Sequence, residues 1–137
     1  MDGEVVNEYV NPPELPAPSG FSHAVVAPPG RTVHLAGQTA LDTTGAIVGD
    51  DVVAQFEICL THLLTALRAA GGAPEHLVST RIYIVDIPDY RRRARDIGRV
   101  WRRLVGTTYP AMAGIGVARL WDDEALVEIE GVAVIPD

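Results

Sequence analysis

Two carboxylates near the C-terminal end of the chain are the residues best suited to chemistry. Glu128 and Glu130 lie in the stretch from Leu126 to Val134, which reads as a β-strand, so both point to the same side of a sheet. Three aliphatic residues, Leu126, Val132 and Val134, share that side. A carboxylate on an apolar face is costly to bury unless it is hydrogen-bonded, forms an ion pair or has a role in catalysis or binding. The pattern favours Glu128 as a general base in a cleft, or as a carboxylate held within a subunit interface.

The strand that carries these carboxylates needs a sheet, and the rest of the sequence predicts the other elements. A helix capped by Asp51 runs to Ala70, because its apolar residues recur at spacings of three and four and glycines follow. In chain order, the predicted elements are an extended leader (1–19), a hairpin (21–27 and 32–36), that helix, a strand (76–87), a helix from Pro88 to Gly106, and two strands (113–120 and 125–135). This order predicts one α+β domain over residues 1–137, a mostly antiparallel sheet with two helices packed on one face.

Composition narrows the classes of function. The chain has 137 residues, 47% of them hydrophobic, which is enough for one real core. Its net charge of -7 disfavours nucleic-acid or anionic-membrane partners. No apolar run is expected to reach the roughly 20 residues of a membrane span, and the single cysteine favours a cytoplasmic location. All 11 basic residues are arginine, which excludes Schiff-base lysine chemistry.

Cofactor and metal motifs are not evident in the sequence. The four histidines lack metal-ligand spacing, and no P-loop or dinucleotide-binding fingerprint follows a strand. No metal and no cofactor are therefore expected. Cys59 lies among apolar residues of the first helix and is expected to be a small core residue. The apolar residues beside Glu128 lie on the sheet face that the helices leave uncovered, which predicts an oligomer.

Several segments, in this order, resemble the RidA/YjgF family of reactive-intermediate (enamine/imine) deaminases, also labelled endoribonuclease L-PSP. They are Pro18-Ser-Gly-Phe-Ser-His-Ala-Val25, Val33-His-Leu-Ala-Gly-Gln38, Val78-Ser-Thr-Arg-Ile-Tyr-Ile-Val-Asp86, Pro110-Ala-Met112 and Val127-Glu-Ile-Glu130. The resemblance implies a chorismate-mutase-like homotrimer that binds a small molecule in clefts between subunits. It also implies that Glu128 positions or activates the water that hydrolyses the imine.

The sequence departs from the family at the positions that bind the substrate. Met112 stands where the deaminases have an arginine that grips the substrate carboxylate, which suits a planar guanidinium. Phe21 replaces a cleft tyrosine and Ala36 a serine, so two hydroxyls are lost. Backbone near Gly37 and Gly114 is expected to bind polar substrate atoms, while Phe21 and Met112 form an apolar wall. Arg95 and Arg119 are candidates for the missing guanidinium, although Arg119 is better interpreted as a surface or interface residue.

The sequence therefore predicts a divergent family member that hydrolyses a small imine, enamine or related reactive metabolite, and that handles 2-iminopropanoate poorly. The alternative is a non-catalytic protein of the same fold that binds small molecules or acts as a chaperone. RNA cleavage is a third possibility, suggested by the family label and by seven arginines in the second helix: Arg91, Arg92, Arg93, Arg95, Arg99, Arg102 and Arg103. A solvated face paired with acidic neighbours is the better interpretation of those arginines.

Overall fold

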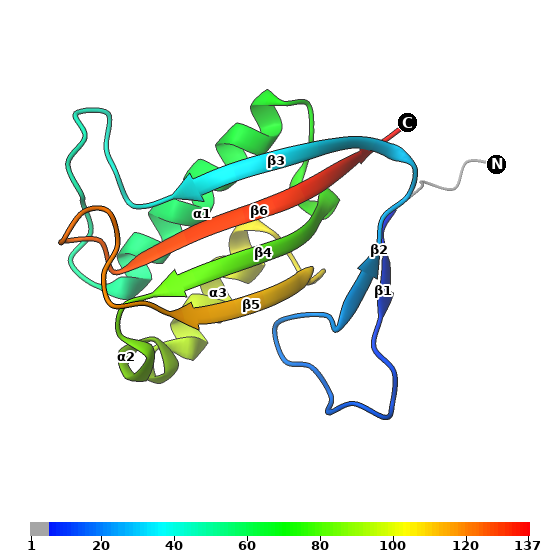
Figure 1. Cartoon of the computed structure of the whole chain (residues 1–137), viewed down its shortest axis with the longest axis horizontal. Coiled ribbons are helices and arrows are strands. Elements are labelled where there is room, and N and C mark those ends of the chain that lie inside the picture. The colour runs from blue at the N-terminus through cyan, green and yellow to red at the C-terminus, as the bar shows by residue number, and fades with distance from the viewer. Residues whose placement is uncertain (1–5) are drawn as a thin grey trace.

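A four-stranded sheet forms the centre of the protein in the computed structural model, which describes residues 6–137. The sheet order is β3-β6-β4-β5. The strands are β3 (Gly30–Gln38), β4 (Leu77–Ile84), β5 (Ala111–Gly116) and β6 (Val127–Pro136). Strand β6 pairs antiparallel with both β3 and β4, whereas β5 runs parallel to β4. The sheet is therefore mixed. Strands β5 and β6 are consecutive in the sequence, but β4 lies between them in the sheet (Figure 1).

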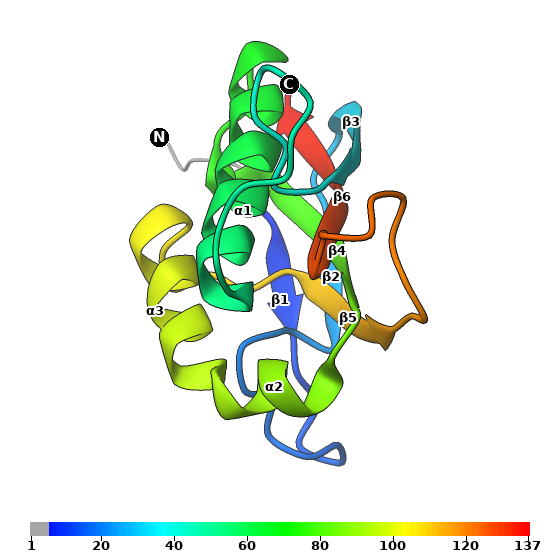
Figure 2. The same ribbon diagram turned by 90° about the vertical axis from the view of Figure 1, so that its left-hand side faces the viewer.

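The helices all pack on one face of this sheet (Figures 1 and 2). They are α1 (Val52–Ala69), the short 3-10 helix η1 (Pro74–His76), α2 (Ile87–Arg92) and α3 (Ala94–Leu104). The predicted cap is present, because Asp51 accepts a hydrogen bond of 2.8 Å from the Ala54 N–H. After α1, Gly71 adopts a positive φ of 96°, a conformation that favours glycine and ends the helix.

The second predicted helix is two helices in the structure. It breaks at Arg93, whose φ of -98° and ψ of 12° leave the helical range. The Arg93 guanidinium reaches back to the first helix and pairs with Asp51 at 3.0 Å. The helical spacing of the apolar residues does not encode this break. The connection β4–α2–α3–β5 is a crossover, which is what allows β5 to run parallel to β4.

The predicted N-terminal hairpin is wrong. Strand β2 (Ala24–Val26) pairs with β1 (Glu8–Val10), which lies inside the region expected to be an extended leader, and not with β3. Residues 1–5 of that leader lie outside the described residues. Pro28 and Pro29 separate β2 from β3; proline fixes φ and has no N–H to donate, so this link does not form the tight turn of a hairpin.

The core lies between the sheet and α1. Helix α1 contributes several side chains that are at most 1% exposed: Phe56, Cys59, Leu60, Leu63, Leu64 and Leu67. By length and mean hydropathy α1, at 18 residues and 1.3, could also cross a membrane, so the expectation that no such run exists was too strict. A helix that covers a sheet in a protein core passes the same test, and these buried leucines place α1 in that role.

Candidate functional site

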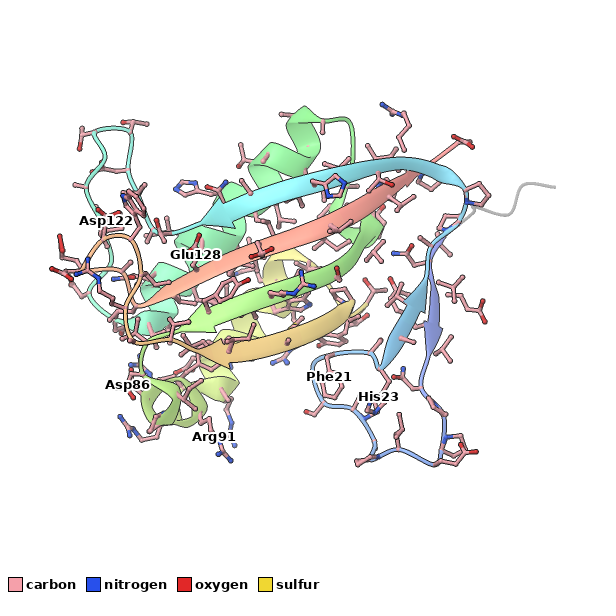
Figure 3. The ribbon with its side chains drawn as sticks, viewed as in Figure 1. Phe21, His23, Asp86, Arg91, Asp122 and Glu128 are labelled. Atoms are coloured by element: carbon pink, nitrogen blue, oxygen red, sulfur yellow. The ribbon has the colours of Figure 1, made fainter. Side chains whose placement is uncertain are left out.

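Glu128 lies on the face of the sheet that the helices leave open. In the register of β4 and β6, Glu128 is opposite Tyr83 and Glu130 is opposite Arg81. Their neighbours Val127 and Ile129 are fully buried on the helix side. Figure 3 shows the Glu128 side chain in front of β6, while the helices lie behind the sheet. The alternation predicted for this strand is thus confirmed.

The two carboxylates have different surroundings. The hydroxyl of Tyr83 donates a hydrogen bond of 2.5 Å to Glu130, and Arg81 lies 3.8 Å from the same carboxylate. Within residues 6–137, Glu128 is only partly exposed and forms no hydrogen bond or ion pair. Burial raises the pKa of Glu128, and repulsion from Glu130 raises it further. Glu130 is therefore a structural partner, and Glu128 is the carboxylate available to accept a proton.

A β-bulge places Ala36 and Gly37 beside Glu128. Leu35 pairs with Gly131 and Gln38 with Ile129, so Ala36 and Gly37 together oppose the single residue Glu130. A Cβ at Gly37 would overlap Oε2 of Glu128. Bulges of this kind often lie next to active sites, where they redirect a side chain or leave backbone groups unpaired. The glycine leaves room for the carboxylate, and a larger residue here would displace the Glu128 side chain from its present position.

Buried Gln55 of α1 fixes the start of β6. Its side-chain oxygen accepts a hydrogen bond of 2.8 Å from the Leu126 N–H, and its nitrogen donates to the Glu124 carbonyl at 3.1 Å. Gln55 is only 2% exposed, so these bonds hold the chain firmly at the point where β6 begins. The position of Glu128, two residues into the strand, follows from this anchor.

The other predicted site residues lie around a cavity on the opposite face of the sheet. Met112 and Gly114 of β5 are in register with buried Thr80 and Ile82 of β4, so they face the helices. A cavity of about 540 Å³ opens there, and Phe21 lies at it too. The lining residues are Ser19, Gly20, Phe21, Phe56, Ile82, Tyr90, Ala94, Ile97, Gly98, Trp101, Arg102, Tyr109, Met112 and Gly114.

The loop that carries Phe21 is attached to the start of β5. Ser22 donates hydrogen bonds to Pro110 through its N–H, at 3.0 Å, and to Tyr109 through its hydroxyl, at 2.6 Å. Tyr109 stacks on Trp101 of α3, with ring centroids 6.3 Å apart. Five aromatic rings therefore contribute to the cavity wall. Figure 3 shows Phe21 in this loop, well separated from Glu128.

The predicted site residues thus form two separate groups in one chain. Ala36, Gly37 and Glu128 lie on the open face, and Phe21, Met112 and Gly114 lie at the cavity on the helix face. The sheet stands between them. One chain by itself does not bring the carboxylate to the cavity, so a site that contains both groups needs a second copy.

Sequence reasoning missed most of the cavity lining, including its polar and aromatic residues Tyr90, Trp101, Arg102 and Tyr109. Tyr90 and Trp101 were recognised only as part of an apolar stripe, which in most helices means core. Burial raises the pKa of Tyr90 to about 12, so its hydroxyl stays a hydrogen-bond donor at neutral pH. Arg102 could not be distinguished from the other arginines of its helix without knowing which side faces the cavity.

Neither candidate for the missing guanidinium lies at the cavity. Arg119 pairs with Asp123 at 2.7 Å and donates to the Leu120 and Trp121 carbonyls, so it stabilises the loop before β6. This agrees with its interpretation as a surface residue. Arg95 is exposed on α3 and does not line the cavity.

Most of the arginine-rich face is neutralised by acidic neighbours. Four of its arginines form ion pairs: Arg92 with Asp89, Arg93 with Asp51, Arg99 with Asp96, and Arg103 with Glu57. Such a network is typical of a solvated helix face, and it leaves less positive charge for phosphates.

The structure shows where Cys59 and the possible metal ligands lie. Cys59 is fully buried, and this burial, with repulsion from Glu128, raises the pKa of its thiol to about 12, so it is an inert core residue as predicted. Among residues 6–137, no group of three or more histidine, cysteine or acidic side chains is placed to hold a metal ion.

Comparisons with known proteins agree with this architecture. A sequence model of the family described as endoribonuclease L-PSP matches residues 11–135. A RutC family protein of Synechocystis is 36% identical over 90% of this chain and 92% of its own length. The 2-iminobutanoate/2-iminopropanoate deaminase of Capra hircus is 30% identical over 95% and 91% of the two chains.

Solved structures with the same fold are also similar in sequence. A protein of unknown function of the conserved Rid family from Yersinia pestis has a TM-score of 0.84 and 36% identity, over 94% of this chain and 98% of that one. The TdcF protein of E. coli, solved with bound serine, has a TM-score of 0.66 and 26% identity, over 87% and 91% of the two chains.

Proposed function

Because the chain belongs to the RidA/YjgF family, we propose that it hydrolyses a small imine, enamine or related reactive metabolite. The observation that carries this proposal is the state of Glu128. Its carboxylate is partly buried beside Gly37 and has no partner among the described residues. A carboxylate whose pKa is raised by burial is a stronger base than one in water.

The complete site would form between subunits. Val132 of β6 lies on the same open face as Glu128 and is only partly buried within one chain, so covering this apolar side chain would favour association. In the homotrimer that the family resemblance implies, each site would combine Glu128 and Gly37 of one copy with the cavity of its neighbour. Three identical clefts would result.

Glu128 would act as a general base in the reaction. It would take a proton from a water molecule as the water oxygen attacks the imine carbon, which converts the C=N bond into a carbinolamine. The proton held by the carboxyl would then pass to the nitrogen. Ammonia would leave as the C=O bond forms, so that one imine and one water give one carbonyl compound and one ammonia.

The native protein would hydrolyse 2-iminopropanoate poorly. Met112 offers no hydrogen-bond donor to a carboxylate, and Phe21 and Ala36 lack hydroxyls. The backbone near Gly37 and Gly114 would still be able to bind polar atoms of the substrate. A small anionic imine would lose water at the apolar wall without compensation.

An assay with imines generated in situ would test the proposal. An amino-acid oxidase would supply 2-imino acids from alanine, leucine and phenylalanine in the presence of semicarbazide, and the protein should divert at least one of them from semicarbazone to keto acid. Glu128→Gln should abolish this diversion because an amide does not accept the proton from water. Glu130→Gln is the matched control and should retain activity. Equal activity of native protein and Glu128→Gln would refute the role of Glu128.

Binding without turnover is the second candidate function. It is favoured by the cavity itself, which has an aromatic wall and carries Met112 and Phe21 where the family resemblance implies an arginine and a tyrosine. A protein of this kind would bind keto acids or imines with no change in the rate at which the imine disappears. The same assay, together with a binding measurement, separates the two functions.

A further inference from the structure

The cavity on the helix face is larger and more aromatic than a three-carbon imino acid needs. Its volume of about 540 Å³ lies well within the roughly 300–1,000 Å³ of pockets that enclose drug-sized ligands. Phe21, Phe56, Tyr90, Trp101 and Tyr109 all contribute rings to its wall. Aromatic walls gain most from a flat apolar group that stacks on them or meets them edge-on.

One positive charge stands at this cavity. Among the described residues that line it, Arg102 is the only charged one. The neighbouring arginines on α3 already form ion pairs, Arg99 with Asp96 and Arg103 with Glu57. Arg102 is exposed and forms no ion pair within residues 6–137, so its guanidinium is available to a ligand at the mouth of the cavity.

Gly98 gives the Arg102 side chain its place. The two residues are four apart on α3 and therefore lie on the same side of the helix. Both line the cavity, and a Cβ at Gly98 would be 3.3 Å from Nη1 of Arg102. The guanidinium thus lies back along the helix over the glycine, beside the aromatic wall.

Trp101, which lines the cavity, has a buried donor without a partner in residues 6–137. Nε1 of Trp101 is buried without a hydrogen-bond partner among the described residues, and the side chain is only 4% exposed. Buried N–H groups of this kind normally have an acceptor. Because the nitrogen itself is buried, a ligand in the cavity would reach it only if the indole ring shifted.

We propose that Arg102 of α3 binds the carboxylate of the ligand, in place of a residue on β5, and that the cavity selects 2-imino acids with an aromatic side chain. The apolar group would lie between Phe21, Met112 and Trp101, with the carboxylate at the mouth. The inference rests on the proposed function for the reaction that follows binding. The binding step can be measured without it.

Phenylpyruvate, the stable keto acid that corresponds to an aromatic imino acid, is the probe. Phenylacetone keeps the ring and the carbonyl and lacks the carboxylate, and pyruvate keeps the carboxylate and lacks the ring. Isothermal titration of the assembled native protein should give a Kd for phenylpyruvate about tenfold below that of either analogue. For phenylacetone, which lacks the carboxylate, a tenfold ratio lies between the contributions expected of an exposed and of a buried charge-assisted hydrogen bond.

Arg102→Gln should raise the Kd of phenylpyruvate about tenfold and leave that of phenylacetone unchanged. Arg103→Gln is the matched control, because Arg103 is adjacent, pairs with Glu57 and does not line the cavity; it should change neither value. Fluorescence in a Trp121→Phe background gives an independent readout, since Trp121 is 91% exposed and its removal leaves Trp101 as the only tryptophan.

Each outcome bears on the inference. No binding of phenylpyruvate, binding of pyruvate with equal affinity, or an Arg102→Gln variant that keeps the preference for the charged ligand would overturn it. Binding that depends on Arg102 without turnover of the imine would support it and refute the proposed hydrolysis. Turnover of the aromatic imine that is indifferent to Arg102→Gln would leave the hydrolysis standing and overturn the role of Arg102.

Discussion

Restoring an arginine on β5 should restore activity toward 2-iminopropanoate. Met112 faces the cavity and is half-buried, so Met112→Arg would place a guanidinium where a small imino acid could meet it. A charge-assisted hydrogen bond to a carboxylate contributes about 1.5–3 kcal/mol. Arg102 lines the same cavity, and two like charges about 4 Å apart repel by about 1 kcal/mol even in water.

The net gain for Met112→Arg is therefore about 0.5–2 kcal/mol, or roughly 2- to 30-fold in kcat/KM. Removing the repulsion with Arg102→Gln in the same chain should increase the gain to about ten- to a hundredfold. The assay is release of pyruvate from the imine that an amino-acid oxidase produces from alanine. Glu128→Gln in the Met112→Arg background should remove the gain.

Two results would refute this reasoning. Native turnover that already matches arginine-bearing relatives would show that Met112 does not limit the reaction. No gain in the double variant, with its fold intact by circular dichroism, would place the limit at the hydroxyls absent from Phe21 and Ala36.

Three further predictions concern stability and RNA. The raised pKa of Glu128 means that its stabilising contribution is complete below the ordinary pKa of a glutamate and is lost as the pH rises through the higher pKa of the folded state. In urea unfolding, Glu128→Gln should therefore gain stability relative to native protein as the pH rises above the ordinary pKa of a glutamate, and a difference that does not change with pH would contradict the shift. Gly98→Ala should stabilise the protein by about 0.5–1 kcal/mol, because Gly98 lies inside α3 and the flexible end of Arg102 can give way; a lower Tm would show that the glycine is needed for packing. Single-stranded RNA should bind weakly and lose affinity steeply with salt, and tight sequence-selective binding at physiological salt, or cleavage lost in an Arg92→Gln, Arg95→Gln variant, would overturn the interpretation of the arginine face.

Local signals predicted the elements whose structure depends on neighbours in sequence. The cap at Asp51 and the glycines after Ala70 set the bounds of α1 to within a residue. Alternation assigned Glu128 and Glu130 to one face of β6, as found. These features depend on hydrogen bonds and side-chain directions within a few residues, which the sequence displays.

Pairing between distant segments was harder to predict. The partner of β2 is β1, about 16 residues earlier in the chain, and the partner of β5 is β4 across two helices. The first pair forms a separate two-stranded sheet and the second lies at one edge of the main sheet, and neither arrangement is displayed by residues near in sequence. The same limitation applies to the cavity, because Arg102 differs from Arg99 and Arg103 only in the side of α3 that it occupies.

The central claim, that one site takes residues from two copies of the chain, can be tested directly by mixing two inactive variants. Glu128→Gln removes the base from the open face, and Gly114→Phe would fill the cavity on the other face. Refolded together in equal amounts, they would form assemblies in which about a quarter of the sites combine an intact base with an intact cavity, whatever the ring size. We predict about a quarter of native imine hydrolysis from the mixture, and none from either variant or from the two mixed without refolding. A refolded mixture no more active than its parents would contradict a shared site.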